Sequence, residues 1–338
     1  MPTSSGARKG GEHHDPLERT GVALAADLRP ESGPIAIVPE PRSPFTDAVE
    51  RAGGTVEPLS EATRGLLWLR PDGAGLSELL REHPGIGWVQ LPWAGVDGFA
   101  DTLAEFAGSA LPIWTSAKSA FSDPVAEHAL ALALAIMRGL PDKARSTSWS
   151  RSKVGISLYG RSVVIIGAGG IAIELIRLLR AFDTHITIVR RHAADVVGAQ
   201  RTVTSQQLLA VLPDADLVVV AAASTDETAQ LIGAAELAAM KPTAALVNIA
   251  RGRLVDSEAL AATLNAGHLA GAGLDVTDPE PLPDGHPLWS APRCIITSHS
   301  ADTPEMTEPL LAGRVSHNVT AFLGDGAFIG VVDPKEGY

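Results

Sequence analysis

The stretch that decides the fold is RSVVIIGAGGIA, residues 161–172. An apolar run leads into a glycine-rich turn, and the residues that follow the turn have a helical pattern of apolar positions. Gly167 allows a tight turn, Gly169 lets a pyrophosphate approach the backbone N–H groups at a helix N-terminus, and Ala172 keeps the helix close to the strand. The stretch predicts the start of a dinucleotide-binding unit. Glycine-rich turns without a ligand are common, so the flanking strands must support this interpretation.

Short apolar runs alternate with helical stretches on both sides of this turn. The candidate strands before it are IAIVP, LLWLR, IGWVQLP and PIWTS, and those after it are HITIV, ADLVVVAA, AALVNIA, AGAGLDV and CIITS. Strands that alternate with helices predict parallel sheets covered by helices on both faces. A chain of 338 residues with 45% hydrophobic content is long enough for two cores. We therefore expect an α/β fold with two Rossmann-like, doubly wound parallel-sheet domains.

Composition argues against several classes of partner. The net charge of −12 disfavours nonspecific attraction to nucleic acid or to anionic membranes. The longest apolar stretch, VAEHALALALAIMRGL, contains charged residues and is too short for a membrane span. The histidines are scattered without the spacing of metal ligands, so no metal is expected. A small-molecule role is favoured.

The chain has a single cysteine, Cys294, which excludes an intrachain disulfide and is typical of a reducing compartment, so we expect a cytoplasmic protein. Residues 1–33 are polar at their start and lack a convincing signal sequence, and we expect them to form a disordered extension.

Cofactor choice is indicated about twenty residues after the glycine turn, where a site for NAD usually carries Asp or Glu. This chain has IVRRHA there, with Arg190 and Arg191 in place of the acid. A guanidinium suits a 2′-phosphate, so NADP is the predicted cofactor, with NAD still possible. Either arginine taken singly could be a solvated charge at the end of a strand.

Three stretches follow predicted strands of the second series: NIARGRLVD, GLDVTDPEPLPDGHPLW and IITSHSADT. Together with WAGVDGF (93–99), PVAEHALALAL (124–134) and GAAELAAMKPTAALVNIARG (233–252), they make the chain resemble the D-isomer-specific 2-hydroxyacid dehydrogenase family from about Pro34 to its C-terminus. The resemblance implies glyoxylate/hydroxypyruvate-type reduction of a small 2-keto acid.

The resemblance implies three catalytic residues. Arg251 matches the arginine that binds substrate, Glu280 the carboxylate of a dyad, and His299 its acid/base. The chemistry gives an independent reason, since the alkoxide formed by hydride transfer needs a proton donor that titrates near neutral pH. A glutamate beside the second ring nitrogen favours the imidazolium and orients the ring. Taken singly, each of these residues is more often a surface charge or an ordinary polar side chain.

Other positions are carried over from the same motifs. Substrate contacts fall on the WAGVDG loop, where backbone amides of Ala94, Gly95 and Val96 would accept the carboxylate and Trp93 would form a pocket wall, although buried tryptophan is as often plain packing. The cofactor positions implied in the nucleotide half are Gly167, Gly169, Gly170, Ile171, Arg190, Arg191, Ala222, Ala250 and Asp275. Asp275 would face the nicotinamide carboxamide, or would otherwise act as a turn cap. The chain departs from the family pattern at Ser298, Ser119 and Gly170, where proline, glycine and arginine are usual.

The resemblance also explains why the glycine turn lies near the middle of the chain. Residues 119–298 are expected to form the dinucleotide-binding domain, inserted into a discontinuous substrate domain made of 34–118 and 299–338. The helix from Pro124 to about Met137 resembles the family's dimerisation element, which implies a homodimer. A buried interdomain helix explains its composition equally well.

Two other functions stay open at this point. A formate dehydrogenase of the same superfamily would pair the histidine with glutamine, whereas this chain has Glu280. Some family members act as nucleotide-sensing corepressors that bind protein partners, and such a role requires no turnover. Oxidation of NADPH by a 2-keto acid, lost in His299→Ala, separates an enzyme from a corepressor.

Overall fold

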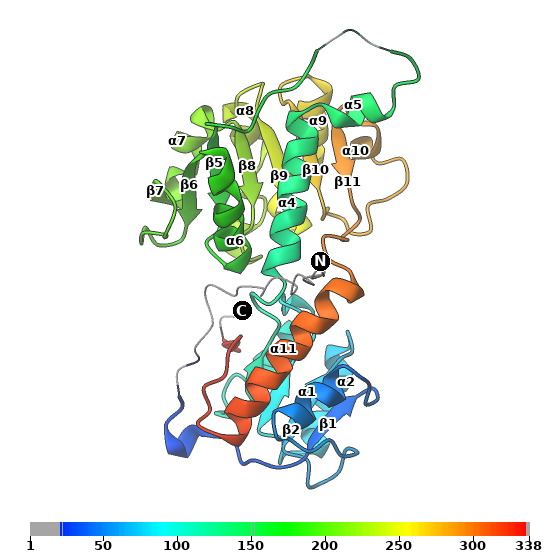
Figure 1. Ribbon diagram of the computed structural model, residues 1–338, viewed down its shortest axis with the longest axis vertical. Coiled ribbons are helices and arrows are strands. Elements are labelled where there is room, and N and C mark those ends of the chain that lie inside the picture. Colours follow the sequence, from blue (N-terminus) through cyan, green and yellow to red (C-terminus); the bar gives the residue numbers. More distant parts are fainter. Residues whose placement is uncertain (1–20, 22, 150, 152, 336–338) are drawn as a thin grey trace, which may run out of the picture.

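The structure is a computed structural model that describes residues 21, 23–149, 151 and 153–335. It has two lobes, each built on a parallel sheet (Figure 1). The α/β class and the two parallel sheets expected from the sequence are confirmed. Among the helices that the structure describes, none combines the length and apolar character needed to cross a bilayer.

The smaller sheet has four strands in the order β1-β2-β3-β4. These are β1 (Ile35–Val38), β2 (Gly65–Trp68), β3 (Trp88–Gln90) and β4 (Ile113–Thr115). One face is covered by α1 (Phe45–Arg51) and by the C-terminal helix α11 (Pro304–Leu323), and the other by α2 (Gly73–Glu82) and α3 (Ala100–Phe106). Because successive side chains of a strand point to opposite faces, Ala36 joins one core and Ile37 the other.

The larger sheet has seven parallel strands in the order β11-β10-β9-β8-β5-β6-β7. These are β5 (Ser162–Ile166), β6 (His185–Arg190), β7 (Arg201–Thr204), β8 (Leu217–Val220), β9 (Ala245–Asn248), β10 (Gly271–Leu274) and β11 (Cys294–Ile296). Helices α4 (Ser122–Met137) and α6 (Gly170–Leu179) pack on one face. The other face is covered by α7 (Leu208–Val211), α8 (Ala234–Ala239), α9 (Ser257–Asn265) and α10 (Pro287–Ser290), and the short α5 (Leu140–Ala144) follows α4.

The strand order reverses between β5 and β8, and in open α/β sheets such a switch point is where ligands bind, outside the carboxyl ends of the strands. The glycine turn follows β5, and Arg251, Glu280 and His299 lie in the loops after β9, β10 and β11. All of these positions therefore lie at the same edge of the seven-stranded sheet.

The N-terminal stretch expected to be disordered falls partly outside the described residues, which omit 1–20 and 22. Within residues 23–33 the chain forms a short 3-10 helix, η1 (Ala26–Leu28), and the Leu24 N–H donates to the Asp325 carbonyl. Pro30 is buried.

Candidate active site

The glycine turn after β5 has a backbone conformation and a close backbone approach that require glycine. Gly167 has φ of +112°, and a Cβ at this position would collide with the backbone of Ala221 at the end of β8, so only glycine fits. Next to it, Gly169 is the N-cap of α6 and has open space beside its Cα. An open approach to the unpaired N–H groups of a helix N-terminus suits a diphosphate, so this turn fits a dinucleotide.

Gly170, where the family usually has arginine, has no room for a side chain. A Cβ there would collide with the hydroxyl of Ser122 and approach the Cβ and Oγ of Ser119 to 2.7 Å. Ser119 is one of the departures noted in the sequence, and its φ of 64° explains why glycine is usual at that position. The two departures are therefore linked, since the segment before α4 occupies the space beside Gly170.

Arg190 is the last residue of β6, and Arg191 follows it with its Nε 3.7 Å from Glu227 Oε2. Both side chains of this pair are solvent-exposed, at 48% and 77%. The guanidinium groups thus lie at the carboxyl end of the strand next to the glycine turn, where the ribose of a dinucleotide would lie.

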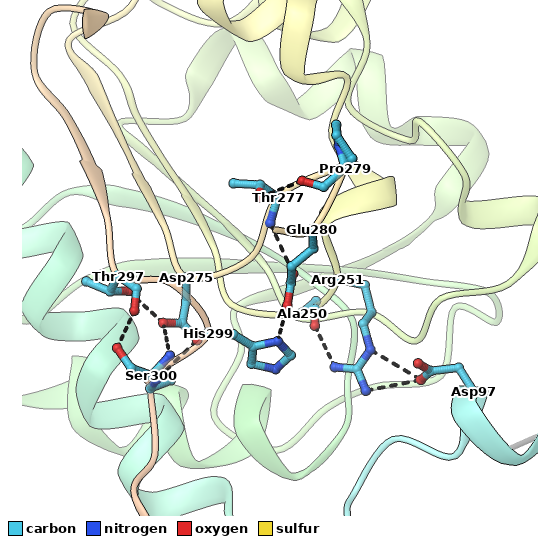
Figure 2. Close-up of polar contacts among 11 residues, drawn as sticks. Asp97, Ala250, Arg251, Asp275, Thr277, Pro279, Glu280, Thr297, His299 and Ser300 are labelled. Carbon is cyan, nitrogen blue, oxygen red and sulfur yellow. Dashed lines mark hydrogen bonds and ion pairs between the residues drawn. The ribbon is translucent and has the colours of Figure 1, made fainter. Parts of the chain in front are cut away.

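The predicted dyad forms in the structure. His299 Nδ1 and Glu280 Oε1 are 2.6 Å apart, and the second carboxylate oxygen of Glu280 accepts from the Thr277 N–H at 3.4 Å (Figure 2). The side chains of His299 and Glu280 are 50% and 41% exposed, so the pair is open to a ligand. With Nδ1 facing the carboxylate, Nε2 is the ring nitrogen left to exchange a proton with a substrate.

The loop that carries His299 is held by Asp275 from the end of β10. Asp275 Oδ1 accepts from the Thr297 hydroxyl at 2.6 Å and from the Ser300 N–H at 2.9 Å, and Oδ2 accepts from the Ala301 N–H at 3.2 Å. The Asp275 carbonyl also accepts from the His299 N–H at 2.5 Å. The Asp275 side chain is 2% exposed, and its Oδ1 also lies 3.6 Å from His128 Nε2 on α4.

Arg251 joins the two lobes. Its Nε and Nη2 donate to Asp97 Oδ1 at 3.2 and 3.1 Å, and its Nη1 donates to the Ala250 carbonyl at 2.8 Å (Figure 2). A Cβ on Gly95 would collide with Nη2, so the guanidinium lies against the WAGVDG loop. The structure thus brings Arg251 together with the loop predicted to bind substrate.

The other residues of that loop are placed differently. Trp93 is 44% exposed with its ring 6.0 Å from that of Phe99, and Ala94 is exposed. The Val96 side chain is packed in the core at 4% exposure, so only its backbone could serve a ligand.

The remaining predicted cofactor positions lie on the larger sheet. Ala222 and Ala250 follow β8 and β9, and Ile171 is in the first turn of α6.

Sequence reasoning missed several polar residues of this region. Asp97 pairs with Arg251, His128 Nε2 is 2.9 Å from Thr297 Oγ1, and Asp302 is half-buried near His299 and Asp275. Burial raises the pKa of Asp302, an effect that His299 opposes and Asp275 reinforces. The only signal for Asp97 was its place inside WAGVDGF. Across the described residues, no group of three or more His, Cys, Asp and Glu side chains could hold a metal ion.

The sequence was compared with known protein families and with individual proteins. Residues 130–301 match the family model described as D-isomer specific 2-hydroxyacid dehydrogenase, NAD binding domain. An uncharacterised protein of Corynebacterium melassecola is 36% identical over 260 residues, which cover 75% of this chain and 84% of that protein. A glyoxylate reductase of Pyrococcus furiosus is 34% identical over 219 residues, which cover 62% of this chain and 65% of that enzyme.

Among solved structures, a D-isomer specific 2-hydroxyacid dehydrogenase from Xanthobacter autotrophicus Py2, in complex with NADPH and MES, superposes with a TM-score of 0.76. The two chains are 25% identical, and the superposition covers 91% of this chain and 100% of the other.

Proposed function

The chain belongs to the D-isomer specific 2-hydroxyacid dehydrogenase family, and from this premise we propose that it reduces small 2-keto acids to 2-hydroxy acids with NADPH. The proposed substrates are of the glyoxylate or hydroxypyruvate type. The glyoxylate reductase among the relatives supports this class, although the match spans just under two thirds of that enzyme.

The observation that carries the proposal is the contact of 2.6 Å between His299 Nδ1 and Glu280 Oε1, which joins the loops after β11 and β10 at the edge of the sheet where Arg251 follows β9. In the proposed reaction His299 donates the proton from Nε2 to the keto oxygen as that oxygen gains charge. Glu280 stabilises the imidazolium and fixes the ring orientation. Arg251 binds the substrate carboxylate and polarises the keto oxygen, and the backbone amides of residues 94–96 complete the anion site.

The residues proposed to hold the cofactor are the Gly167–Ile171 turn, Ala222, Ala250 and the arginines after β6. When bound, NADPH supplies the hydride. Arg190 offers a planar cation to the 2′-phosphate, and its position at the end of β6 supports this role. The family resemblance also implies that Asp275 contacts the nicotinamide, and the variant Asp275→Asn tests that contact.

The activity test is a panel of 2-keto acids assayed with NADPH and NADH in parallel. We expect NADPH oxidation with glyoxylate or hydroxypyruvate and its loss, by at least about 100-fold in kcat, in His299→Ala. His185→Ala is the matched control, because His185 is exposed at the amino end of β6, the edge opposite the site. Absence of turnover by the wild-type protein with every 2-keto acid would instead favour a binding role without catalysis.

Cofactor preference has its own test. We expect Arg190→Ala to weaken NADPH binding, measured by quenching of protein fluorescence, and to leave NADH binding unchanged. Arg201→Ala is the control, since Arg201 is an exposed arginine at the amino end of β7. A wild-type preference for NADH of tenfold or more, about 1.4 kcal/mol, would refute the role proposed for Arg190.

We also propose that the protein is a homodimer. On α4, Ala131 is exposed and Leu130 and Leu134 are only partly buried against the core, and the segment after it exposes Leu140 and Trp149 at 50% and 93%. Light scattering at micromolar concentration should give twice the mass of the chain, and a monomer mass would refute the proposal.

A further inference from the structure

Each of the three guanidinium nitrogens of Arg251 donates to a protein oxygen in this structure. Two of these nitrogens, Nε and Nη2, donate to the same oxygen of Asp97, at 3.2 and 3.1 Å. The third nitrogen, Nη1, donates to the Ala250 carbonyl at 2.8 Å. A substrate carboxylate that binds this arginine in the bidentate manner through Nε and Nη2 needs the two adjacent donors that Asp97 already occupies.

The position of Asp97 reinforces this competition. Asp97 belongs to the WAGVDG loop of the smaller lobe and begins the 3-10 helix η2 (Asp97–Phe99), whereas Arg251 follows β9 of the larger sheet. The Arg251 guanidinium also lies against Gly95, beside the backbone amides proposed to bind the same substrate carboxylate. The Asp97 carboxylate therefore contacts Arg251 at the place where the anionic end of a 2-keto acid would lie.

The exposure of the two side chains shows that the contact can open. Asp97 is 63% exposed and Arg251 33% exposed, so the aspartate can turn into solvent without breaking any packed core. Exposed ion pairs of this kind are weak, and a substrate carboxylate that also gains the loop amides can replace one.

We infer that Asp97 is an internal competitor of the substrate: its carboxylate occupies Arg251 in the resting enzyme and is displaced when the carboxylate of a 2-keto acid binds. This inference rests on the proposed function, in which Arg251 binds substrate. Asp97 so acts as a specificity-determining residue that raises KM and leaves the proton transfer by His299 unchanged.

The magnitude follows from the weakness of the pair. An exposed ion pair that must be broken before binding raises KM by about two- to fivefold, which corresponds to about 0.4–1 kcal/mol. Removal of the Asp97 carboxylate should lower KM by that factor.

The experiment compares Asp97→Asn and Asp97→Ala with the wild-type enzyme. KM and kcat are measured with glyoxylate, and inhibition constants are measured with oxamate, a carboxylate that resembles a 2-keto acid and is not reduced. Binding of oxamate to the enzyme–NADPH complex is also measured by calorimetry, which requires no turnover. Asp101→Asn is the matched control, because Asp101 is an exposed aspartate in the first turn of the next helix, α3, whereas the carboxylate that pairs with Arg251 is that of Asp97.

We expect both Asp97 variants to bind glyoxylate and oxamate two- to fivefold more tightly with kcat unchanged, and Asp101→Asn to behave as the wild-type enzyme. Unchanged or weaker binding in both Asp97 variants would overturn the inference, because it would mean that Asp97 is neutral or orients Arg251 for the substrate. In that case turnover by the wild-type enzyme would leave the proposed function standing. A wild-type protein that neither reduces a 2-keto acid nor binds oxamate would refute both.

Discussion

At the scale of single residues, the dyad was accessible to sequence reasoning and its surroundings were not. His299 and Glu280 were identified through motifs that resemble those of the family, and the structure places His299 Nδ1 2.6 Å from Glu280 Oε1. Both side chains are exposed to solvent. Because Glu280 is partly exposed, its carboxylate can be replaced by an amide of similar size, and its contribution to catalysis can be measured by removing only its charge.

Glu280→Gln should lower kcat for 2-keto acid reduction by about 10- to 100-fold, because the amide neither stabilises the imidazolium nor fixes the ring as a carboxylate does. The matched control is Glu258→Gln, since Glu258 Oε1 lies 3.2 Å from His286 Nε2 in a second His–Glu pair, formed between the first turn of α9 and the N-cap of α10 and not including His299. Steady-state kinetics with saturating NADPH would test this. Equal effects of the two substitutions would contradict the assignment of Glu280.

Asp302 gives a prediction about pH. Burial raises its pKa in the folded protein, so the folded state disfavours the ionised carboxylate relative to the unfolded chain. Asp302→Asn should therefore raise the Tm at pH 7, which lies above the ordinary pKa of 3.8 that the unfolded carboxyl has. The difference should shrink as the pH falls through the raised pKa towards the ordinary value of 3.8, below which both states are protonated. Thermal melts from pH 4 to pH 8 test this, and a difference independent of pH would contradict it.

Asp97 could not have been identified as a partner of Arg251 from the sequence. The two residues are 154 positions apart and belong to different sheets, and an ion pair between distant loops leaves no periodic signal. The crowding at Gly170 by Ser119 and Ser122 was equally hidden, since it depends on how the segment before α4 approaches the turn.

At the scale of elements, the sequence was sufficient to locate strands with a clear apolar pattern and insufficient to locate those with a weak one. The strands β5, β8 and β9 are buried runs of aliphatic residues, and each was predicted within a residue or two. The strand β7, with sequence RTVT, was missed because it is short, polar and at the edge of the sheet. Loop positions were found through motifs, yet the contacts that hold those loops depend on the fold.

The loop after β11 provides a test of such contacts. In Asp275→Asn an NH₂ group replaces one of two oxygens that accept from N–H groups or a hydroxyl, so we expect a loss of about 1–3 kcal/mol in the free energy of unfolding. Displacement of His299 should also lower kcat. If Asp275 acts only through the loop, NADPH binding measured by fluorescence should be unchanged, whereas a direct contact with the nicotinamide would weaken it.

The control for this variant is Asp256→Ala, which removes an N-cap, because Asp256 Oδ1 accepts from the Ala259 N–H at 3.0 Å at the start of α9, at the far end of its loop from Arg251. It should lose stability and keep kcat. A loss of kcat in both variants would show that general destabilisation, rather than the position of His299, lowers the rate.

At the scale of the whole molecule, the first and last parts of the chain form one core. Helix α11 packs on α1 and on the four-stranded sheet, after the chain has passed through the seven-stranded sheet (Figure 1). The Phe322 ring lies 5.3 Å from that of Trp88 on β3, and both side chains are buried. Asn318 adds a buried hydrogen bond to Gln90 at 2.9 Å. The smaller lobe is therefore incomplete until the C-terminal helix is in place.

Phe322→Ala should weaken the smaller lobe selectively. Removal of a buried phenylalanine side chain costs about 3–5 kcal/mol, and that loss falls on the sheet that carries the WAGVDG loop rather than on the glycine turn. Calorimetry should show an earlier unfolding transition, accompanied by a red shift in Trp fluorescence as Trp88 becomes exposed, while NADPH still raises the temperature of the later transition. Leu323→Ala is the control, because Leu323 is the next residue of α11 and is 37% exposed. A single cooperative transition, shifted equally in Phe322→Ala and Leu323→Ala, would contradict this prediction. It would show that the two lobes unfold as one unit and that the C-terminal helix stabilises both lobes.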